Sequence, residues 1–392
     1  MTNFDAIIVG GGAAGLFCAL TAGARGKRVL VLERNAEVGA KILISGGGRC
    51  NFTNVNAGDA KCFISANPHF ARSALARFKP TDFIALIEKH RIAYYEKTLG
   101  QLFCEGAGAA KKIVRMLLDE CAAGGVEIRT DCALRSVSRG ESFRVETTQG
   151  AFEAAALVVA SGGLSIPKLG ANDIAYRIAK HFNVPISPTR PGLVPLTFGE
   201  DDLAWMRPLS GVSTDVVARC GNARFREAAL FTHRGLSGPA TLQVSSYLTP
   251  GGVVELDWAP DVSEEFLAER KRARPKALIK TALSEIIPAR LAEALTVQAA
   301  QTPLGDHSDE GLRVLMRIVK VARFIPTGTE GYAKAEVTVG GIDVNALSQQ
   351  TMEARAAPGL FFIGECADVT GWLGGYNFQW AWASGAAAGR AI

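Results

Sequence analysis

Hydrophobic positions near the N-terminus change from a strand-like run to a helical period and back again. An apolar run at 4–9 leads into a glycine-rich stretch, followed by a small-residue helical pattern at 16–25 and a second β-branched run at 28–32. A strand, a helix and a strand within about 30 residues have the size of a βαβ unit. The pattern therefore predicts that the chain begins with an α/β domain.

Periodicity also predicts the elements that follow. It indicates helices at 80–90 and 108–123, strands at 126–129, 134–137, 143–147 and 152–154, a buried strand at 157–160, and near the end a strand at 360–363 and an apolar helix from about 377. The segment 37–54 has neither period and contains Gly39, Gly46, Gly47 and Gly48. Irregular segments of this length in compact domains are usually functional or disordered, so we interpret it as a binding loop.

Four prolines mark a change in the sequence pattern in the middle of the chain. Pro185, Pro188, Pro191 and Pro195 interrupt any helix, and the pattern of short strands follows to about 256. Residues 261–301 have helical spacing and composition. A pattern of short strands and glycines returns near 336–341. We therefore predict a discontinuous first domain at 1–188 and 332–392 and an insert at 189–331. The insert is expected to be β-rich at 189–258 and about 320–331 and helical at about 259–319.

Composition excludes several classes of protein. Hydrophobic residues are 48% and charged residues 21% of 392, so the chain folds around a large core. The net charge of +5 is too mild to indicate a nucleic-acid partner, and none is expected. Eight cysteines without a Cys-x-x-Cys pair predict neither a metal site nor a disulfide framework. With no signal peptide and no membrane-length apolar run, a cytoplasmic location and no membrane partner are expected; the oligomeric state is left open.

The glycine-rich stretch after the first strand carries the first chemical motif. Gly10-x-Gly12-x-x-Gly15, with Ala13 and Ala14, follows a strand and opens a helix, where backbone N–H groups and the helix dipole favour a pyrophosphate. Glu33, followed by Arg34, ends the second strand, where a carboxylate accepts hydrogen bonds from a ribose 2′-OH. This combination predicts a dinucleotide site, and the acid favours FAD or NAD over NADP.

A second motif near the C-terminus favours FAD. The strand at 360–363 is followed by Gly364, Glu365 and Asp368, which resembles the second FAD-contact motif of flavoproteins with a two-dinucleotide fold. By that resemblance, Asp368 faces the ribityl hydroxyls or the pyrophosphate. Gly374-Gly375-Tyr376-Asn377 then opens the last helix, whose dipole can stabilise negative charge at N1/C2=O of a reduced flavin.

Five segments together resemble one known family. They are 40–45, 45–54 with the run Ser-Gly-Gly-Gly-Arg-Cys-Asn, 161–163 with Pro167-Lys168, 231–240, and 374–377. In combination they resemble the BaiN/YhiN-like, aminoacetone-oxidase-like bacterial FAD-binding proteins over nearly the whole chain. The resemblance implies a glutathione-reductase-type, Rossmann-like FAD domain interrupted by a β-barrel-like and helical insert. FAD is expected to be non-covalent, because no flavinylation motif is evident.

The cofactor residues expected from these motifs and the resemblance form one set. Besides the residues of the two motifs above, it comprises Lys41, Ser45, Gly46, Gly47, Arg49, Cys50, Asn51, Leu134, Ser161, Gly162 and Gly163. Lys41 or Lys168 can donate to a pyrophosphate or to flavin N5, or remain a solvated charge. Cys50 is either a redox partner of the flavin or a packed thiol, and no resolving cysteine is evident nearby.

Two residues are candidates for catalysis. His233 lies in a glycine-flanked motif and can protonate a substrate as hydride arrives, or simply bind loop backbone. Tyr376 belongs to an aromatic group with Trp372, Trp380 and Trp382 that forms either a substrate pocket or helix packing.

The function favoured by these features is FAD-dependent oxidoreduction of an unidentified small molecule, with NAD(P)H as a candidate transient donor. One alternative is an oxidase that passes electrons to O2. Another is a flavin-containing RNA-modifying or regulatory protein that uses the basic run at 270–276, although acidic neighbours favour a solvated helix face there.

Overall fold

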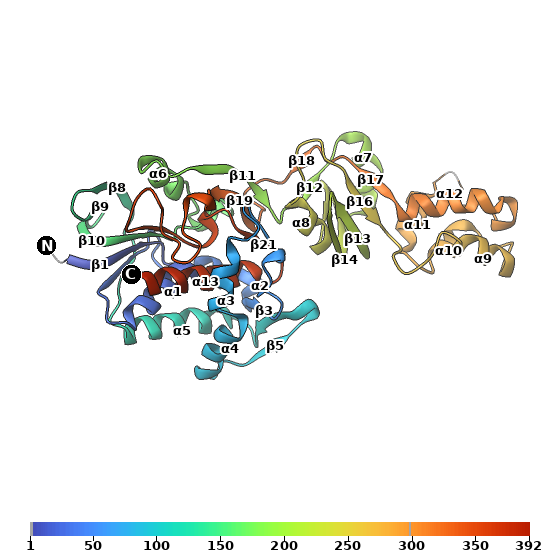
Figure 1. Cartoon of the computed structure of the whole chain (residues 1–392). Coiled ribbons are helices and arrows are strands. Elements are labelled where there is room, and N and C mark those ends of the chain that lie inside the picture. Colours follow the sequence, from blue (N-terminus) through green and yellow to red (C-terminus); the bar gives the residue numbers. More distant parts are fainter. Residues whose placement is uncertain (1–2, 298) are drawn as a thin grey trace. The chain divides into compact units, whose positions relative to one another are not determined.

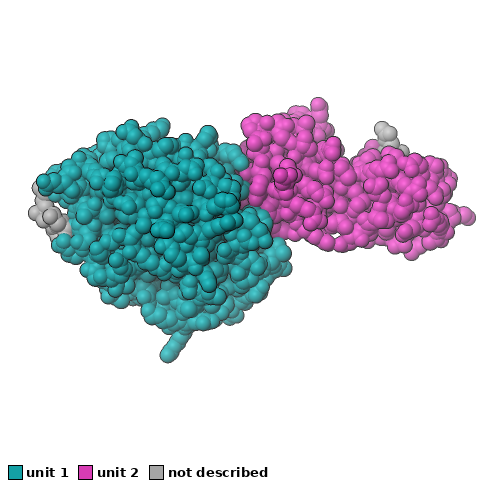
Figure 2. Space-filling model, viewed as in Figure 1, with its two compact units in different colours: residues 1–190, 337–392 teal, residues 191–336 magenta. Residues whose placement is uncertain are grey.

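The computed structural model describes residues 3–297 and 299–392. The chain divides into two compact units, coloured separately in Figure 2. Unit 1 comprises Met1–Arg190 and Val337–Ile392, and unit 2 comprises Pro191–Glu336.

Unit 1 is built on a mixed sheet whose central strands are parallel. Its order is β7 (Glu127–Arg129), β2 (Val29–Leu32), β1 (Asn3–Val9), β10 (Gly150–Val159), β9 (Phe143–Thr147) and β8 (Leu134–Arg139), and β20 (Leu360–Phe362) also pairs with β10. Strands β7, β2, β1, β10 and β20 run parallel, whereas β9 and β8 form an antiparallel extension. The carboxyl ends of β1, β2, β10 and β20 therefore lie at one edge, where ligands bind in such sheets.

Helices α1 (Ala13–Gly23) and α13 (Tyr376–Ala391) pack against each other in unit 1 (Figure 1). Two glycines of α13 make this approach possible. A Cβ at Gly385 would lie 2.6 Å from the carbonyl oxygen of Ala14, and one at Gly389 would lie 2.7 Å from that of Cys18. The C-terminal helix thus lies directly on the helix that opens the N-terminal βαβ unit.

The other helices and strands of unit 1 surround this centre. They are α2 (Ala40–Gly48), α3 (Ala71–Arg77), α4 (Pro80–Lys89), α5 (Ala110–Ala123) and α6 (Ile174–His181), and the short strands β3 (Asn51–Asn54), β4 (Phe63–Ile64), β5 (Tyr94–Glu96), β6 (Gln101–Cys104), β11 (Ile186–Gly192), β19 (Val337–Ile342) and β21 (Thr370–Gly371). Strand β3 is tied to α13, because the Thr53 hydroxyl donates to Gln379 Oε1 at 2.7 Å and Trp382 Nε1 donates to the Phe52 carbonyl at 2.8 Å.

Two expectations for unit 1 are wrong. The segment 37–54 is not an irregular loop, because it contains α2 and β3; its glycines interrupt the helix with left-handed backbone at Gly46 and Gly47 and hide the short helical turn in the sequence. The expected strands at 152–154 and 157–160 are one strand, β10. Its first part pairs with β9 on one side and its last part with β20, so its exposure pattern changes along its length.

Unit 2 contains an antiparallel sheet. Its order is β17 (Ala322–Phe324), β16 (Val254–Asp257), β13 (Ser213–Cys220), β14 (Ala223–Thr232), β15 (Gly235–Ser237), β12 (Leu196–Thr197) and β18 (Gly328–Thr329). Residues 325–327 are the whole connection between the two edge strands, β17 and β18. Because this connection is so short, the two edges of the sheet lie close together. Helices α7 (Glu200–Met206) and α8 (Pro239–Ser245) interrupt the run of strands that the sequence predicted.

The helical part of unit 2 comprises α9 (Phe266–Ala273), α10 (Ile279–Leu283), α11 (Ala289–Leu295) and α12 (Asp309–Lys320). A largely buried ion pair joins it to the sheet: Lys320 Nζ lies 3.1 Å from Asp257 Oδ2 and donates to the Ala259 carbonyl at 2.8 Å. Because both groups are largely withdrawn from water, loss of either partner leaves an uncompensated charge.

The approach of α13 to α1 leads to a test of packing. Gly385→Ala is expected to lower the stability of unit 1 by about 1–3 kcal/mol, since the new methyl meets backbone that cannot move aside. This outweighs the gain of up to about 1 kcal/mol that alanine normally brings to a helix. The thermal midpoint of the apoprotein measures the change. Gly140→Ala is the control, because no atom of the described residues lies within 4 Å of the added Cβ. An unchanged midpoint for Gly385→Ala would contradict the packing argument.

Candidate functional site

The glycine-rich turn after β1 contains two glycines that pack against backbone and one that faces open space. A Cβ at Gly10 would lie 2.5 Å from the Ala160 carbonyl oxygen, and one at Gly15 would lie 1.9 Å from that of Gly10. These two positions are therefore closed by backbone. At Gly12, the N-cap of α1, no atom of the described chain meets an added Cβ within 4 Å. Open space beside a helix N-terminus is what a pyrophosphate requires.

Glu33 is buried at the end of β2, beside this turn. Its Oε2 accepts from the Gly11 N–H at 2.9 Å, and its Oε1 accepts from the Asn35 N–H at 2.8 Å. The Cys132 N–H donates to the Glu33 carbonyl at 2.9 Å, which brings the segment leading to Leu134 alongside. Arg34 is exposed and donates to the Gly170 carbonyl at 3.2 Å, so its side chain serves a surface loop.

The turn after β10 brings Ser161, Gly162 and Gly163 to the same edge of the sheet. Ser161 Oγ is buried and finds no hydrogen-bond partner among the described residues. Gly162 again faces open space, whereas a Cβ at Gly163 would lie 2.4 Å from Thr338 Oγ1. Buried hydroxyls are normally satisfied, so Ser161 fits a ligand atom beside the open space over Gly162.

Lys41 forms a network that sequence analysis did not foresee. Its Nζ lies 2.6 Å from both Glu365 Oε2 and Ser165 Oγ, and Glu365 Oε1 accepts from Ser165 Oγ at 2.8 Å. Glu365 also accepts from the Thr338 N–H at 3.0 Å. Ser165 and Thr338 were not predicted, because no local signal marks residues whose partners lie so far along the chain. The network holds a single ammonium group in place between α2 and the turns after β10 and β20.

The side chains of the turn at 45–51 differ in their exposure to solvent. Arg49 is exposed, with its guanidinium 5.5 Å from the centre of the Phe103 ring and donating to Tyr95 Oη at 3.2 Å. Cys50 is fully buried, and burial raises the pKa of its thiol, which stays protonated at neutral pH. A protonated buried thiol is a poor nucleophile, so packing is the role that the surroundings of Cys50 favour.

Asparagine side chains hold the turn that opens α13. In the amide orientation that satisfies both ends, Asn51 donates to the carbonyls of Thr53 and Leu102 at 3.1 Å and accepts from the Gly375 N–H at 3.2 Å. Asn377 accepts from the Gly371 N–H at 2.8 Å and donates to its carbonyl at 2.9 Å. The side chains of Asn51 and Asn377 therefore set the backbone of the Gly374-Gly375 turn.

Gly364 and Asp368 complete the edge of the sheet. A Cβ at Gly364 would lie 2.8 Å from the Ala14 Cβ, which shows how closely the second motif approaches the first. Asp368 is buried, its Oδ2 accepts from the Ala66 N–H at 3.2 Å, and burial raises the pKa of its carboxyl. The residues of both motifs thus gather at the carboxyl ends of the parallel strands.

The two candidate catalytic residues lie in different units. Tyr376 is buried in unit 1 between Phe63 and Trp372, with ring centres 6.0 and 5.9 Å away. His233 lies in unit 2 at the turn between β14 and β15, in a pocket with Phe198 and Arg207. Their shared action on a substrate stays a prediction, and Tyr376 is placed for packing.

Comparison with known proteins identifies the family of the chain. A family profile described as the HI0933-like protein Rossmann domain matches residues 4–391. The chain belongs to this family. It is 50% identical over 392 residues to the ribosomal RNA dihydrouridine synthase of Escherichia coli K12, covering 98% of this chain and 96% of that protein. It is 44% identical to the Haemophilus influenzae protein of the same name, with 98% of each covered.

Two more distant likenesses extend the comparison. A 3-dehydro-bile acid delta(4,6)-reductase of Clostridium scindens is 29% identical over 98% of each chain. The solved structure of a Rhodococcus jostii 3-ketosteroid-delta4-(5alpha)-dehydrogenase shares the fold with a TM-score of 0.50 at 13% identity, covering 99% of this chain and 97% of that one.

These findings confirm the expected family, the α/β Rossmann-like fold and the class of enzyme. The chain is a flavin-dependent oxidoreductase, and the open space over Gly12 and Gly162 with the unsatisfied Ser161 hydroxyl fits FAD. Among the described residues, no helix has the length and apolar character needed to cross a membrane.

Glu33 offers a direct test of the cofactor site. Glu33→Ala is expected to weaken FAD by about 1–3 kcal/mol, because the ribose hydroxyls lose a buried acceptor. Glu33→Gln keeps one acceptor oxygen and the side-chain shape, so its effect is expected to be smaller. Titration of the apoprotein with FAD, followed by flavin fluorescence, measures the affinity. Glu37→Ala, an exposed neighbour, is the control. Equal affinity of Glu33→Ala and the control would reject this role.

Asp368 offers a test through pH. Because the pKa of its carboxyl is raised in the fold, the folded state keeps the proton to a higher pH than the unfolded state does. The free energy of unfolding therefore falls as the pH rises through the raised pKa. Asp368→Asn removes this penalty. Its apoprotein is expected to melt above the wild type at neutral pH, with the gap closing as the pH falls toward the ordinary range of a carboxyl. Asp173→Asn, at an exposed position, controls for surface charge. A gap independent of pH would contradict the assignment.

Proposed function

We propose that this chain reduces uridine to dihydrouridine in ribosomal RNA. The observation that carries the proposal is 50% identity to a protein named ribosomal RNA dihydrouridine synthase, over 98% of the chain. The proposal departs from the initial expectation of a small-molecule substrate and no nucleic-acid partner. Among the alternatives weighed from the sequence, it is the RNA-modifying one that we develop.

The chemistry suits a flavin enzyme. Dihydrouridine is uridine with a hydride and a proton added across the C5–C6 bond; non-covalently bound FAD, once reduced by NAD(P)H, would supply the hydride, and a proton originating from water completes the addition. The bile-acid relative is named a delta(4,6)-reductase, so its name also describes a reduction.

The residues of unit 1 prepare the site for this reaction. Glu33 presents a buried carboxylate whose two oxygens are held by the N–H groups of Gly11 and Asn35. Glu365 and Ser165 hold the Lys41 ammonium, so it needs no reorganisation as negative charge develops nearby. Asn51 and Asn377 hold the turn before α13, so the start of that helix is fixed by the chain itself.

The electron donor is part of the proposal. NAD(P)H binds transiently, because Gly10 to Gly15 is the glycine motif that follows a strand and opens a helix, and FAD takes that position. Reduction of a small molecule and transfer of electrons to O2 remain the competing outcomes that an activity measurement separates.

The decisive measurement is nucleoside mass spectrometry. Purified protein with FAD, incubated anaerobically with NADH or NADPH and ribosomal RNA transcribed in vitro, is expected to convert uridine to a nucleoside heavier by two hydrogens. The same mixture without the nicotinamide donor is the control. Oxidation of the donor without any dihydrouridine, on transcripts and on ribosomal RNA extracted from cells that lack this protein, would reject the proposed function.

A further inference from the structure

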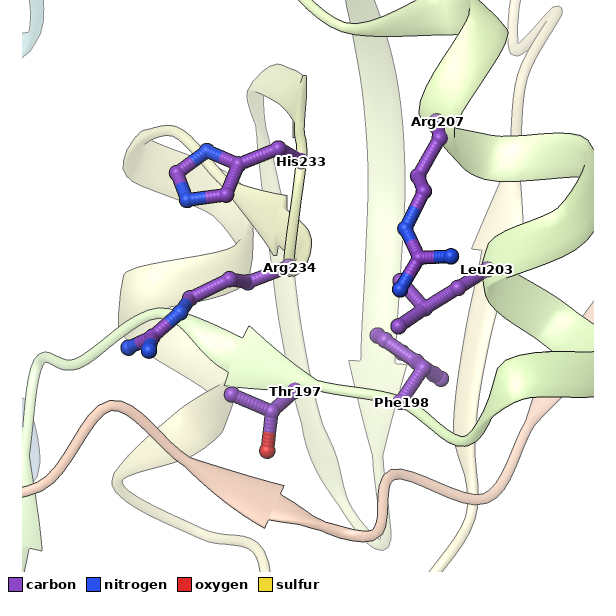
Figure 3. Close-up of a pocket in the computed structure, with 6 residues that line it drawn as sticks. All are labelled: Thr197, Phe198, Leu203, Arg207, His233 and Arg234. Carbon is purple, nitrogen blue, oxygen red and sulfur yellow. The ribbon is translucent and has the colours of Figure 1, made fainter.

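A pocket in unit 2 combines cationic groups with an apolar floor. It has a volume of about 390 Å³ and is lined by Thr197, Phe198, Leu203, Arg207, His233 and Arg234. Figure 3 shows His233 and Arg234 on the turn between β14 and β15, with their side chains directed away from Arg207, which lines the pocket from the other side. The cationic groups thus come from two segments that the sequence separates widely.

The turn that carries His233 and Arg234 is held tightly. A Cβ at Gly235 would lie 2.4 Å from the Phe198 ring and 2.5 Å from the Leu196 carbonyl oxygen, so only glycine allows the turn to descend onto this floor. The Phe198 N–H donates to the Arg234 carbonyl at 3.3 Å, and the Arg234 N–H donates to Thr232 Oγ1 at 3.2 Å. Both side chains are therefore presented from a fixed backbone.

The floor of the pocket is anchored in the core of unit 2. The Phe198 ring packs edge-on against Phe324 with centres 6.0 Å apart, and Phe324 in turn contacts Trp205 and Trp258. Phe198 is buried, so its position does not depend on a ligand. A rigid base with charged groups at its rim reduces the entropy lost when an anion binds.

The guanidinium groups are available to an anion. Arg207 pairs with Glu200 through two contacts of 2.8 Å, but both side chains are exposed, and exposed pairs are weak. Arg234 is 60% exposed and lies 3.9 Å from Glu330, at the limit of an ion pair. Arg290, from α11, donates to the carbonyl of Pro208, the residue after Arg207, and is not among the residues that line the pocket.

The basic run at 270–276 is engaged more fully. Arg270 and Arg274 both reach Glu285, at 2.7 and 3.5 Å, and Lys271 reaches Asp309 at 2.8 Å. Those ion pairs link α9 to its neighbours and favour a structural role. The pocket therefore offers a better anion site than the run that stands out in the sequence.

We propose that this pocket binds a backbone phosphate of the substrate RNA, with Arg207 and Arg234 as the phosphate ligands and His233 beside them. This inference rests on the proposed function and assigns unit 2 a part in holding the RNA. Arg207 and Arg234 both line the pocket, Arg234 is largely exposed and free to turn toward a ligand, and guanidinium groups are donors that suit the acceptor oxygens of a phosphodiester. The described residues at the pocket provide no glycine cradle of the kind that binds a dinucleotide pyrophosphate.

The test measures the affinity of the FAD-loaded protein for a fluorescein-labelled uridine-containing RNA hairpin, by anisotropy at several salt concentrations. The double variant Arg207→Ala/Arg234→Ala is expected to bind roughly tenfold or more weakly near 0.1 M salt, and its log–log salt slope is expected to fall by about one for each arginine removed. Arg323→Ala, an exposed arginine of unit 2 outside the pocket, is the matched control and is expected to change little.

A second variant tests the same idea in the opposite direction. Glu200→Gln frees the Arg207 guanidinium and is expected to tighten RNA binding severalfold, whereas a purely structural ion pair would leave affinity unchanged or lower it. Far-ultraviolet circular dichroism and the FAD content of each variant establish that the fold is kept.

The outcomes separate the pocket from the proposed function. If the wild type forms dihydrouridine but the double variant keeps the RNA affinity and salt slope of the wild type, the pocket assignment is overturned while the function stands. If the double variant instead raises the KM for NADPH and leaves RNA binding intact, the pocket serves the nicotinamide donor and the assignment is also overturned. Absence of dihydrouridine with the wild type would reject the function itself.

Discussion

Close approach of backbone to backbone is the constraint on which unit 1 depends. Gly15 lies against the Gly10 carbonyl, Gly364 lies against Ala14, and Gly385 lies against the carbonyl of Ala14. Each contact leaves no room for a side chain, and together they bring the first βαβ unit, the strand near the C-terminus and the last helix into one body. The cofactor site lies at this junction, where two other glycines, Gly12 and Gly162, face open space.

Polar groups around this junction are held before any ligand arrives. Glu33 is fixed by two backbone N–H groups, and Lys41 is fixed by Glu365 and Ser165. Asp368 is buried at the cost of a raised pKa, which is the kind of local penalty that functional sites carry. Such preorganisation suits a flavin enzyme, because the cofactor carries out the redox chemistry and the protein supplies position and electrostatics.

Unit 2 differs from unit 1 in its core and in the groups that make its polar contacts. Its sheet is antiparallel, its core is an aromatic cluster that includes Phe231, Trp258 and Phe324, and its cationic pocket stands on that cluster. Side chains, rather than backbone N–H groups, provide the polar contacts there. This difference matches a division of work in which unit 1 binds the dinucleotide and unit 2 contacts a polymeric anion, as proposed above.

Much of unit 1 was determined by the sequence itself. The first strand, the glycine motif and the second strand are local patterns. Helices α4 and α5 begin and end within a few residues of the ranges that periodicity predicts, and α13 begins within a residue of its predicted start. Local signals failed where glycine interrupts an element, as in α2, and where one strand changes partners along its length, as in β10.

The tertiary structure decided which side chains meet. Lys41 and Glu365 stand 324 positions apart, and Arg207 meets the turn at His233 and Arg234 through folding of unit 2. It also decided that Tyr376 and Cys50 are buried, although their motifs suggested contact with a ligand. A sequence records residue types and their local spacing, whereas burial and pairing depend on contacts between distant segments, which only the folded chain brings together.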